Sequence, residues 1–443
     1  MKQTFKFAAL AALSILAACN REAVVNVNEN KQEEVSTTKA AQLKITILGD
    51  APTKASDTAT QGGENYMNDV EVFVFDANSS SISYGFLEAY KKVSGSEISN
   101  GTSATVTLNT TTGQKNVYVV ANAGTNSNAS PAGDLASTIT KESQLLSAIS
   151  EFSDNGAKDF IMVGSATKEL AAGNASANTL DVKVKRLVAR VKIGTVKGDF
   201  TSPALRQSKF VVKKIYLVNV PKQVKYVNGD ATDVFGSGDK ALSSGYPSIF
   251  TPASSGMKYY VYDAPAESDA ANGFYNWMNP DTFNASTQTM TLSDNSAVQA
   301  LTVKTYSESE GKLFAESGAS VNALSDNTLK ANVYFYCYPN SSEANTGSEN
   351  MTEADFTTKL VIETELTLEG KTSTFYYPIS IPYIQPNYAY TVNSLTIKRL
   401  GSTDPFHPVS TAECTFKVTV QDWYSGDIVG EYNGETSDDS FEI

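Results

Sequence analysis

Apolar and polar residues alternate along many short runs of this chain, and this alternation limits its fold more than any other feature. In the run Gln42–Leu48, the side chains of Leu43, Ile45 and Ile47 share one face, and mainly polar side chains share the other. A period of two that includes β-branched residues is typical of a half-buried β-strand. Similar runs recur almost to the end of the sequence, so we expect a mostly β protein.

Several later runs indicate strands of two kinds. The run Asp69–Asp76 has valines on one face and phenylalanines on the other, which predicts a central strand covered on both sides. The run Cys414–Trp423 is apolar on one face only. Between Leu180 and Ile193 the alternation shifts by one residue, which indicates a bulge or two consecutive strands. A helix is expected only at about 138–152, with Leu145, Leu146 and Ile149 on one stripe.

The first 18 residues are typical of an export signal. Two lysines precede an apolar run that is too short to span a bilayer, and the segment closes with Leu16-Ala17-Ala18-Cys19. These last residues match a bacterial lipobox, which predicts that Cys19 is acylated and becomes the mature N-terminus. A lipidated cysteine would hold the protein to a membrane.

Composition shifts divide the rest of the chain. Residues 19–41 are polar and are predicted to be a flexible tether. A small, polar stretch at 173–178 predicts a boundary between an N-terminal domain at 42–178 and a C-terminal domain at 179–443. Residues 229–330 are irregular and rich in Gly, Ser, Asp and Asn.

The first predicted strand is followed by an exposed turn that ends in a basic residue. Gly49, Asp50 and Pro52 break the strand, and Lys54 then lies in the small, polar sequence Thr-Lys-Ala-Ser-Asp. A trypsin-like protease could enter such a segment and cut between Lys54 and Ala55. An ordinary strand followed by an ordinary loop would give the same pattern.

Signals of catalysis or of cofactor binding are nearly lacking. The sequence has one histidine, His407, and lacks the zinc-protease, nucleophile-elbow and phosphate-loop motifs. We therefore expect no enzymatic activity, no cofactor and no metal site. The formal net charge of −13 argues against a nucleic-acid partner, because phosphate binding needs a basic face.

Two cysteines remain beyond Cys19. Cys337 and Cys414 both lie in strand-like runs of an exported protein, so they could form a disulfide. Nothing in the sequence places the two strands side by side, which favours buried thiols.

Several segments in series resemble the FimA-type fimbrillins, the pilins of type V fimbriae in Bacteroidales. They are the LAAC lipobox, VEVFVFDAN, KNVYVVANAG, FIMVG, VKRLVARVKIG, NYAYTVNSLTIKRLG and TFKVTVQDW. They occur in the family's order and cover most of the chain except 229–330. The basic residue at the family's cleavage position is commonly Arg, whereas here the match falls on Lys54.

The resemblance implies two tandem β-sandwich domains of transthyretin-like or Greek-key type, with one or two short helices. It also implies export as a lipoprotein to the outer membrane and the cell surface, and cleavage near Lys54 that releases the strand with Leu43, Ile45 and Ile47. A donor strand near 412–432 from another copy, or from a related fimbrial subunit, would then fill the vacated groove. The predicted donor residues are Phe416, Val418, Val420, Trp423, Ile428 and Val429.

Such a subunit would polymerise into a fimbria and mediate adhesion, as a virulence factor, with host proteins or glycans as further partners. Two other functions stay open. The chain could be an anchor or tip subunit of the same fimbria, or a lipid-anchored surface protein that binds glycans without polymerising.

Overall fold

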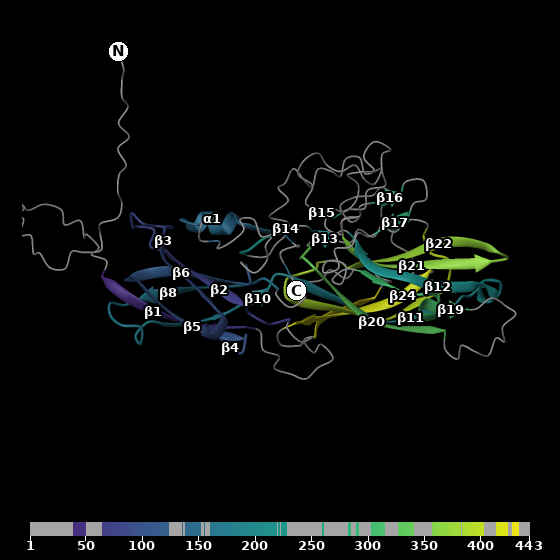
Figure 1. The fold of residues 1–443 in the computed structure, drawn as a ribbon, viewed down its shortest axis with the longest axis horizontal. Helices are drawn as coiled ribbons and strands as arrows, with labels where there is room; N and C mark the ends of the chain where they lie inside the picture. The colour runs from purple at the N-terminus through teal and green to yellow at the C-terminus, as the bar shows by residue number, and fades with distance from the viewer. Residues whose placement is uncertain are drawn as a thin grey trace, which may run out of the picture. The chain divides into compact units, whose positions relative to one another are not determined.

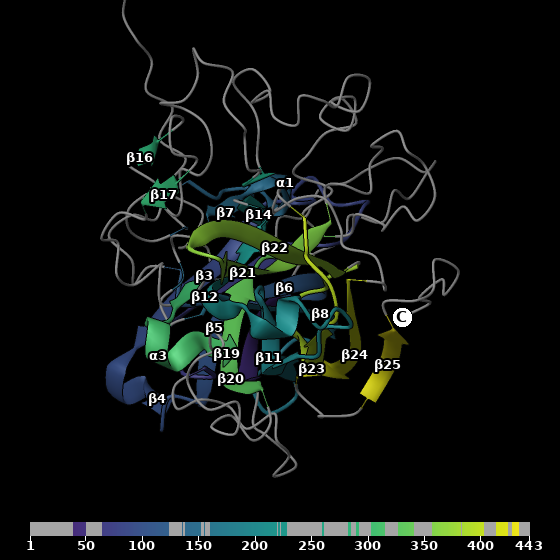
Figure 2. The same cartoon turned by 90° about the vertical axis from the view of Figure 1, so that its right-hand side faces the viewer.

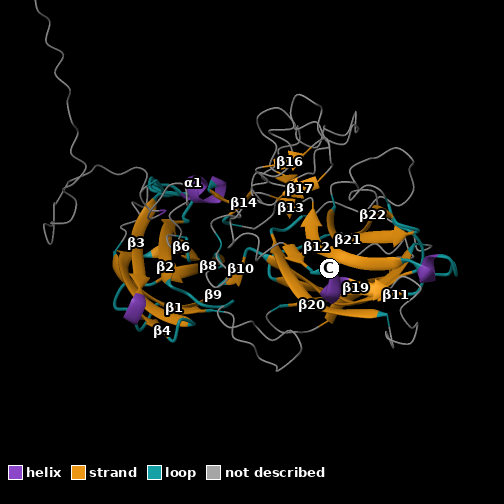
Figure 3. Cartoon of the chain, turned by 45° about the vertical axis from the view of Figure 1, so that its right-hand side comes forward, coloured by secondary structure: helices purple, strands orange, loops and turns teal. Residues whose placement is uncertain are grey.

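A computed structural model gives the fold of the chain in the following ranges. The structure describes residues 39–49, 64–123, 135, 138–151, 155, 160–218, 220–221, 223–227, 259–260, 282–284, 289–291, 303–314, 327–340, 357–381, 383–402, 413–423 and 428–433. Strands dominate these ranges, and helices are few and short (Figure 3). None of the described helices is long and apolar enough to cross a bilayer.

The first sandwich consists of two sheets (Figure 1). One has the strand order β4-β5-β1-β9 and the other β10-β8-β6-β2-β3. The strands are β1 (Ala40–Leu48), β2 (Asp69–Asp76), β3 (Leu87–Ser94), β4 (Ile98–Ser99), β5 (Ser103–Thr111), β6 (Gly113–Ala121), β8 (Met162–Leu170), β9 (Thr179–Lys183) and β10 (Lys185–Arg186). Every residue of β2 is buried, and the strand pairs with β3 and β6, so its prediction as a central strand is confirmed.

The second sandwich also has two sheets, which Figure 2 shows as two layers. Their strand orders are β20-β11-β23-β24-β25 and β18-β12-β21-β22, with β19 also paired to β12. The strands are β11 (Ala189–Gly198), β12 (Lys209–Val218), β18 (Val303–Thr305), β19 (Lys312–Phe314), β20 (Thr328–Cys337), β21 (Thr358–Leu368), β22 (Lys371–Ile381), β23 (Tyr388–Ile397), β24 (Cys414–Asp422) and β25 (Ile428–Asn433). The predicted fold class, mostly β with two sandwiches and short helices, is confirmed.

Short strand pairs and helices complete the described chain. The pairs are β7 (Ile149–Glu151) with β14 (Gln223–Lys225), β13 (Val220–Pro221) with β15 (Tyr259–Tyr260), and β16 (Thr282–Asn284) with β17 (Thr289–Thr291). The helices are α1 (Glu142–Ser147), α3 (Glu308–Gly311) and the 3-10 turns η1 (Gly95–Glu97) and η4 (Leu205–Gln207).

The helix predicted at 138–152 is much shorter than expected. It spans Glu142–Ser147 and buries Leu145, whereas Leu146 is exposed. The predicted stripe fails at Ile149 because that residue begins β7, whose backbone pairs with β14 instead of continuing the helix.

The predicted domain boundary at 178 is too early. β9 pairs with β1, and β10 pairs with β8, so both strands belong to the first sandwich. The phase shift between Leu180 and Ile193 therefore marks three strands, because β9, β10 and β11 follow one another in different sheets. The first sandwich runs to Arg186.

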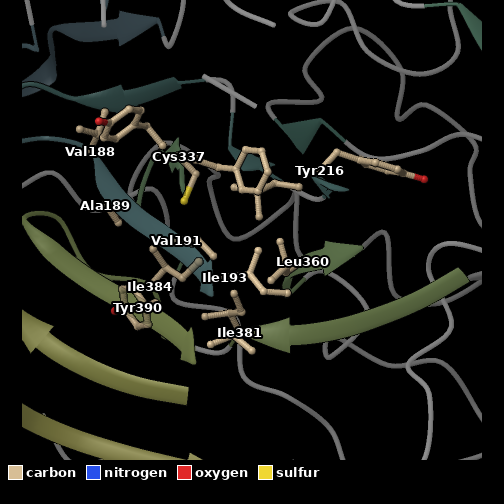
Figure 4. Close-up of a cluster of buried hydrophobic side chains, with 14 of the residues drawn as sticks. Val188, Ala189, Val191, Ile193, Tyr216, Cys337, Leu360, Ile381, Ile384 and Tyr390 are labelled. Carbon is tan, nitrogen blue, oxygen red and sulfur yellow. The ribbon is translucent and has the colours of Figure 1, made fainter. Parts of the chain in front are cut away.

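Each sandwich has an apolar interior. The side chains of Leu43, Ile45 and Ile47 pack with valines of β2, β5 and β6 in the first core. In the second core, Val191 and Ile193 of β11 approach Leu360 and Ile381 of the facing sheet (Figure 4). Buried residues of this second cluster continue to Phe73 and Phe75, on the outer face of β2, so one apolar cluster joins the two sandwiches.

An ordered turn connects β2 to β3. We call residues 77–86 the β2–β3 turn. Several backbone bonds close it on itself: Gly85 N donates to the Asp76 carbonyl at 2.7 Å, and Phe86 N donates to the Ser83 carbonyl at 2.9 Å. The Asp76 carboxylate also accepts from Ser83 Oγ at 2.6 Å and from Asn78 N at 3.1 Å. The turn is therefore held rigidly by its own polar groups.

Asp76 also belongs to a buried ion cluster. Lys115 Nζ lies 3.4 Å from Asp76 and 2.9 Å from Glu88. Burial alone would raise the pKa of Asp76. Hydrogen bonds from the turn and the charge of Lys115 outweigh burial and hold that pKa below its usual value.

Replacing this carboxylate should destabilise the protein in a way that depends on pH. We expect Asp76→Asn to lower the free energy of unfolding by about 1–3 kcal/mol at neutral pH. A carboxyl group with a depressed pKa stabilises the fold above its unfolded pKa of about 4, and loses this effect as the pH falls through the folded pKa. Urea unfolding across this range should therefore show the difference closing from about pH 4 downward. The exposed Asp199→Asn is the control, and a difference that stays constant with pH would contradict the expectation.

Candidate functional site

The predicted leaving strand, β1, lies inside its sheet. It pairs with β5 antiparallel over nine residue pairs and with β9 parallel over five. Leu43, Ile45 and Ile47 are each 0% exposed. A backbone hydrogen bond to a later loop also fixes β1, because Gln42 N donates to the Gly173 carbonyl at 3.0 Å. Removing β1 would therefore leave a slot with an apolar floor and two unpaired strand edges, which we call the β1 slot.

The chain leaves β1 and returns at neighbouring points. Gly49 N donates to the Thr102 carbonyl at 2.8 Å, and Met67 N donates to the Gly101 carbonyl at 2.7 Å. Between these two attachments, residues 50–63 are outside the described ranges, and they include the predicted cleavage residues Lys54 and Ala55. A cut in this interval would separate β1 covalently from the rest of the first sandwich.

Glu64, the first described residue after that interval, is buried and bonded to both sandwiches. Arg190 Nη1 of β11 lies 3.3 Å from its carboxylate. The hydroxyl of Tyr336, in β20, donates to the same carboxylate. Arg186 Nε donates to the Glu64 backbone carbonyl at 2.9 Å. The chain that follows the predicted cut is thus fixed to the second sandwich.

The electrostatics of this contact are those of a buried pair. Both Glu64 and Arg190 are nearly inaccessible to solvent, so each charge depends on the other for compensation. Burial, together with the Glu64 carboxylate, raises the pKa of Tyr336 far above its ordinary value. Tyr336 therefore stays protonated and keeps its hydroxyl as a donor.

Trp423 completes this buried region from the end of β24. The guanidinium carbons of Arg186 and Arg190 lie 4.4 and 4.7 Å from its ring centroid. Its ring stacks on Tyr336 at 5.9 Å, with 11° between the planes. Its backbone N donates to the Asn387 carbonyl at 3.0 Å. We call Glu64, Arg186, Arg190, Tyr336 and Trp423 the inter-sandwich junction.

The structure places most of the predicted donor residues inside the second sandwich of their own subunit. Val418, Val420 and Trp423 are buried in the second sandwich, and Phe416 packs partly against the same core. β24 is hydrogen-bonded to β23 on one side and to β25 on the other. Releasing β24 as a donor would dismantle the core and the inter-sandwich junction of its own subunit.

The next strand, β25, has fewer contacts with its own sandwich. β25 lies at the end of its sheet and pairs with β24 alone. Ile428 is 60% exposed. An ion pair between Lys417 and Glu431 fixes the strand at the surface, where such pairs contribute little. Of the predicted donor residues, Ile428 and Val429 therefore lie on the strand whose release would break the fewest contacts.

The remaining predicted sites divide into two groups. Cys19 and His407 lie outside the described ranges. Cys337 and Cys414 are buried free thiols, as the favoured alternative predicted, because β11 and β23 separate their strands. Burial raises the pKa of the Cys414 thiol to about 12. No cluster of three or more potential metal ligands occurs among the described residues.

Sequence reasoning missed Glu64, Arg186 and Arg190 as site residues. A usable signal was present: two arginines stand four residues apart in VKRLVARVKIG, a run that is otherwise suited to a strand interior. Charged side chains there need a buried partner. The sequence does not indicate that the partner is Glu64, more than a hundred residues earlier.

A comparison of the sequence with protein families tests the resemblance described above. Residues 41–199 match the family described as "Major fimbrial subunit protein (FimA)". The resemblance to the FimA-type fimbrillins is confirmed. The match covers the first sandwich from the second residue of β1 onward, and it ends one residue after β11. No curated protein matches the chain.

Solved structures agree with a fimbrillin fold. A fimbrilin (fimA) from Porphyromonas gingivalis W83 has a TM-score of 0.52 and 14% identity, over 87% of this chain and 99% of that one. Putative cell adhesion proteins from Bacteroides eggerthii and Parabacteroides distasonis have TM-scores of 0.50 and 0.51, with 20% and 18% identity. Each covers 87% of this chain, and the matches span 96% and 99% of those chains. At these identities the likeness establishes the fold alone.

Proposed function

We propose that this chain is a structural pilin subunit of a surface fimbria, and that it polymerises by strand exchange and mediates adhesion. The observation that carries the proposal is the position of β1. It fills a slot in its own sandwich, and residues 50–63 alone link it to the chain that follows. Cleavage at Lys54–Ala55 by a trypsin-like protease would leave β1 held only by its hydrogen bonds and apolar packing, so another strand could replace it.

Export would precede this exchange. In the proposal, the segment up to residue 18 directs secretion, and Cys19 is acylated and holds the subunit at the outer membrane. Cleavage after Lys54 then separates both the lipid and β1 from the folded subunit. The partners are other copies of this chain or related fimbrial subunits, and the surface fimbria would in turn meet host proteins or glycans.

The proposed donor is β25 of another copy. A regular strand has alternating faces, so Ile428 and Gly430 would share one face of the donor in the β1 slot, although a register shift separates them in their own sheet. Each β25 leaves only one neighbour, β24, and gains two in the slot, β5 and β9. Main-chain hydrogen bonds and apolar burial would thus favour exchange over the closed monomer.

The slot cannot stay empty. Withdrawing Leu43, Ile45 and Ile47 from the core gives up roughly 5–9 kcal/mol of apolar burial, in addition to the hydrogen bonds on both sides. Open strand edges with an apolar floor would also aggregate. We therefore infer that the donor enters as β1 leaves, so that paired groups are replaced stepwise.

The mature N-terminus of surface-exposed protein tests the proposal. A start at Ala55 in sheared fimbriae, with assembled copies visible by electron microscopy, is the expected result. A lipidated Cys19 retained in fimbriae would instead favour an anchor subunit, which the two-sided pairing of β1 would suit. Fimbriae built from copies with β1 still covalently attached would refute strand exchange. Binding on a glycan array by protein that never polymerises would favour the lipid-anchored surface protein.

A further inference from the structure

The β2–β3 turn carries three exposed large apolar side chains close together, including the most exposed one among the described residues, Ile82. Ile82, Tyr84 and Phe86 are 102%, 54% and 44% exposed. They stand at alternate positions of a turn that its own backbone bonds hold rigid, with Lys141 Nζ 4.7 Å from the ring centroid of Phe86. Exposed apolar side chains that gather in one place, instead of being scattered singly, are typical of an interaction site.

The turn lies at the end of the first sandwich where β1 begins. Ala77 N, at the start of the turn, donates to the Gln114 carbonyl at 2.9 Å. Thr112 N, two residues before Gln114, donates to the Lys39 carbonyl at 2.8 Å. Figure 1 shows β3, which follows the turn, and the purple start of β1 at this same end of the sandwich.

The chain's own second sandwich joins the opposite end of β1. Val184 N, in the step from β9 to β10, donates to the Leu48 carbonyl at 3.0 Å. The inter-sandwich junction follows within a few residues. The second sandwich is therefore attached near Leu48, at the C-terminal end of β1. The N-terminal end of β1, next to Lys39, faces away from that attachment.

Strand direction decides where a donating copy must lie. A donor that restores the long ladder with β5 runs antiparallel to β5, in the direction of β1. Its first residue then takes the place near Lys39, and the body from which it comes lies beyond that end. Trp423 fixes the root of the donor in its own body, and Ile428 follows five residues later, a span of at most about 18 Å.

We propose that the β2–β3 turn is the docking surface for the donating copy of this chain, which contacts it with the region of its second sandwich around the end of β24. This inference rests on the proposed strand exchange. The short tether brings that region to the end of the first sandwich that carries Ile82, Tyr84 and Phe86. The contact buries apolar side chains and orients the incoming strand.

The test compares variants of the full chain after cleavage by a trypsin-like protease. Ile82→Ser with Tyr84→Ser should slow polymer formation about tenfold, because the orienting contact is lost. Exchange of β1 for a synthetic peptide of residues 424–443 should change less than about twofold, because the peptide brings no body to dock. Tyr66→Ser is the matched control, an exposed tyrosine beside Gly101, near the other end of β1.

A position-specific crosslink identifies the partner. With a photoreactive benzoylphenylalanine in place of Tyr84, we expect a crosslink to residues 187–423 of another copy, and none from position 66. Unchanged polymerisation of the double variant would overturn the docking surface while strand exchange stands. Equal slowing of polymer formation and peptide exchange would overturn it too, because the turn would then act on the slot. Failure of the unmodified chain in both assays would refute strand exchange, and the docking surface with it.

Discussion

A chain with Lys54 replaced by alanine should stay monomeric after treatment with a trypsin-like protease, while the unmodified chain forms a ladder of polymers. Lys54 is the only basic residue between Lys44 and Lys91, so the interval 50–63 offers no second site to such a protease. Without the cut, β1 remains covalently attached beside its slot, where its effective concentration excludes an incoming donor. Ladder formation should fall to that of an untreated sample.

The controls separate loss of cleavage from loss of folding. Lys54→Arg keeps a basic residue at the position and should polymerise like the unmodified chain. Thr53→Ala changes the neighbouring side chain and should have no effect. Denaturing gels follow the polymers, and N-terminal sequencing follows the cut. A full ladder from Lys54→Ala with an intact N-terminus would remove the case for proteolytic activation.

The sequence was sufficient to predict β1, but not its two-sided pairing. Alternation at Leu43, Ile45 and Ile47 reports which face is buried, and the structure confirms that face. The alternation does not indicate which strands pair with β1, because a central strand and an edge strand with one apolar face have the same pattern. β9, the parallel partner of β1, comes from a run whose shift of phase concealed three separate strands.

The same limit applies to the predicted donor residues. Phe416, Val418 and Val420 alternate as a donor strand would, yet an internal strand of a sandwich needs the same pattern. What distinguishes β25 from β24 is its position at the edge of the sheet and the exposure of Ile428. Both are properties of the assembled sandwich, and local periodicity does not determine them.

Replacing Trp423 should destabilise the protein strongly. We expect Trp423→Ala to lower the free energy of unfolding by about 3–5 kcal/mol, because the ring is almost fully buried. Part of this loss comes from two guanidinium groups, which also lose their contact with the ring. Trp423→Phe keeps a flat ring in the same place and should recover part of the stability.

The companion substitution is Glu64→Gln, which preserves shape and removes charge. It leaves Arg190 buried without its carboxylate and should cost about 3–5 kcal/mol. Because both residues belong to one network, the Trp423→Ala and Glu64→Gln effects should not add, and the double variant should fall short of the sum by about 1 kcal/mol or more. Chemical unfolding of the four chains measures this coupling.

The coupling also bears on the polymer. Glu64 follows the proposed cut, and Trp423 precedes the proposed donor strand. One network therefore contacts both the start of the cleaved chain and the residue from which the donor strand extends. Cleaved Trp423→Ala chains should still exchange β1 for donor peptide, because the β1 slot is unchanged, while their polymers should dissociate at lower denaturant than unmodified polymers. Strictly additive effects of the two substitutions, or polymers of unchanged resistance, would show that the junction is only a local element of the fold.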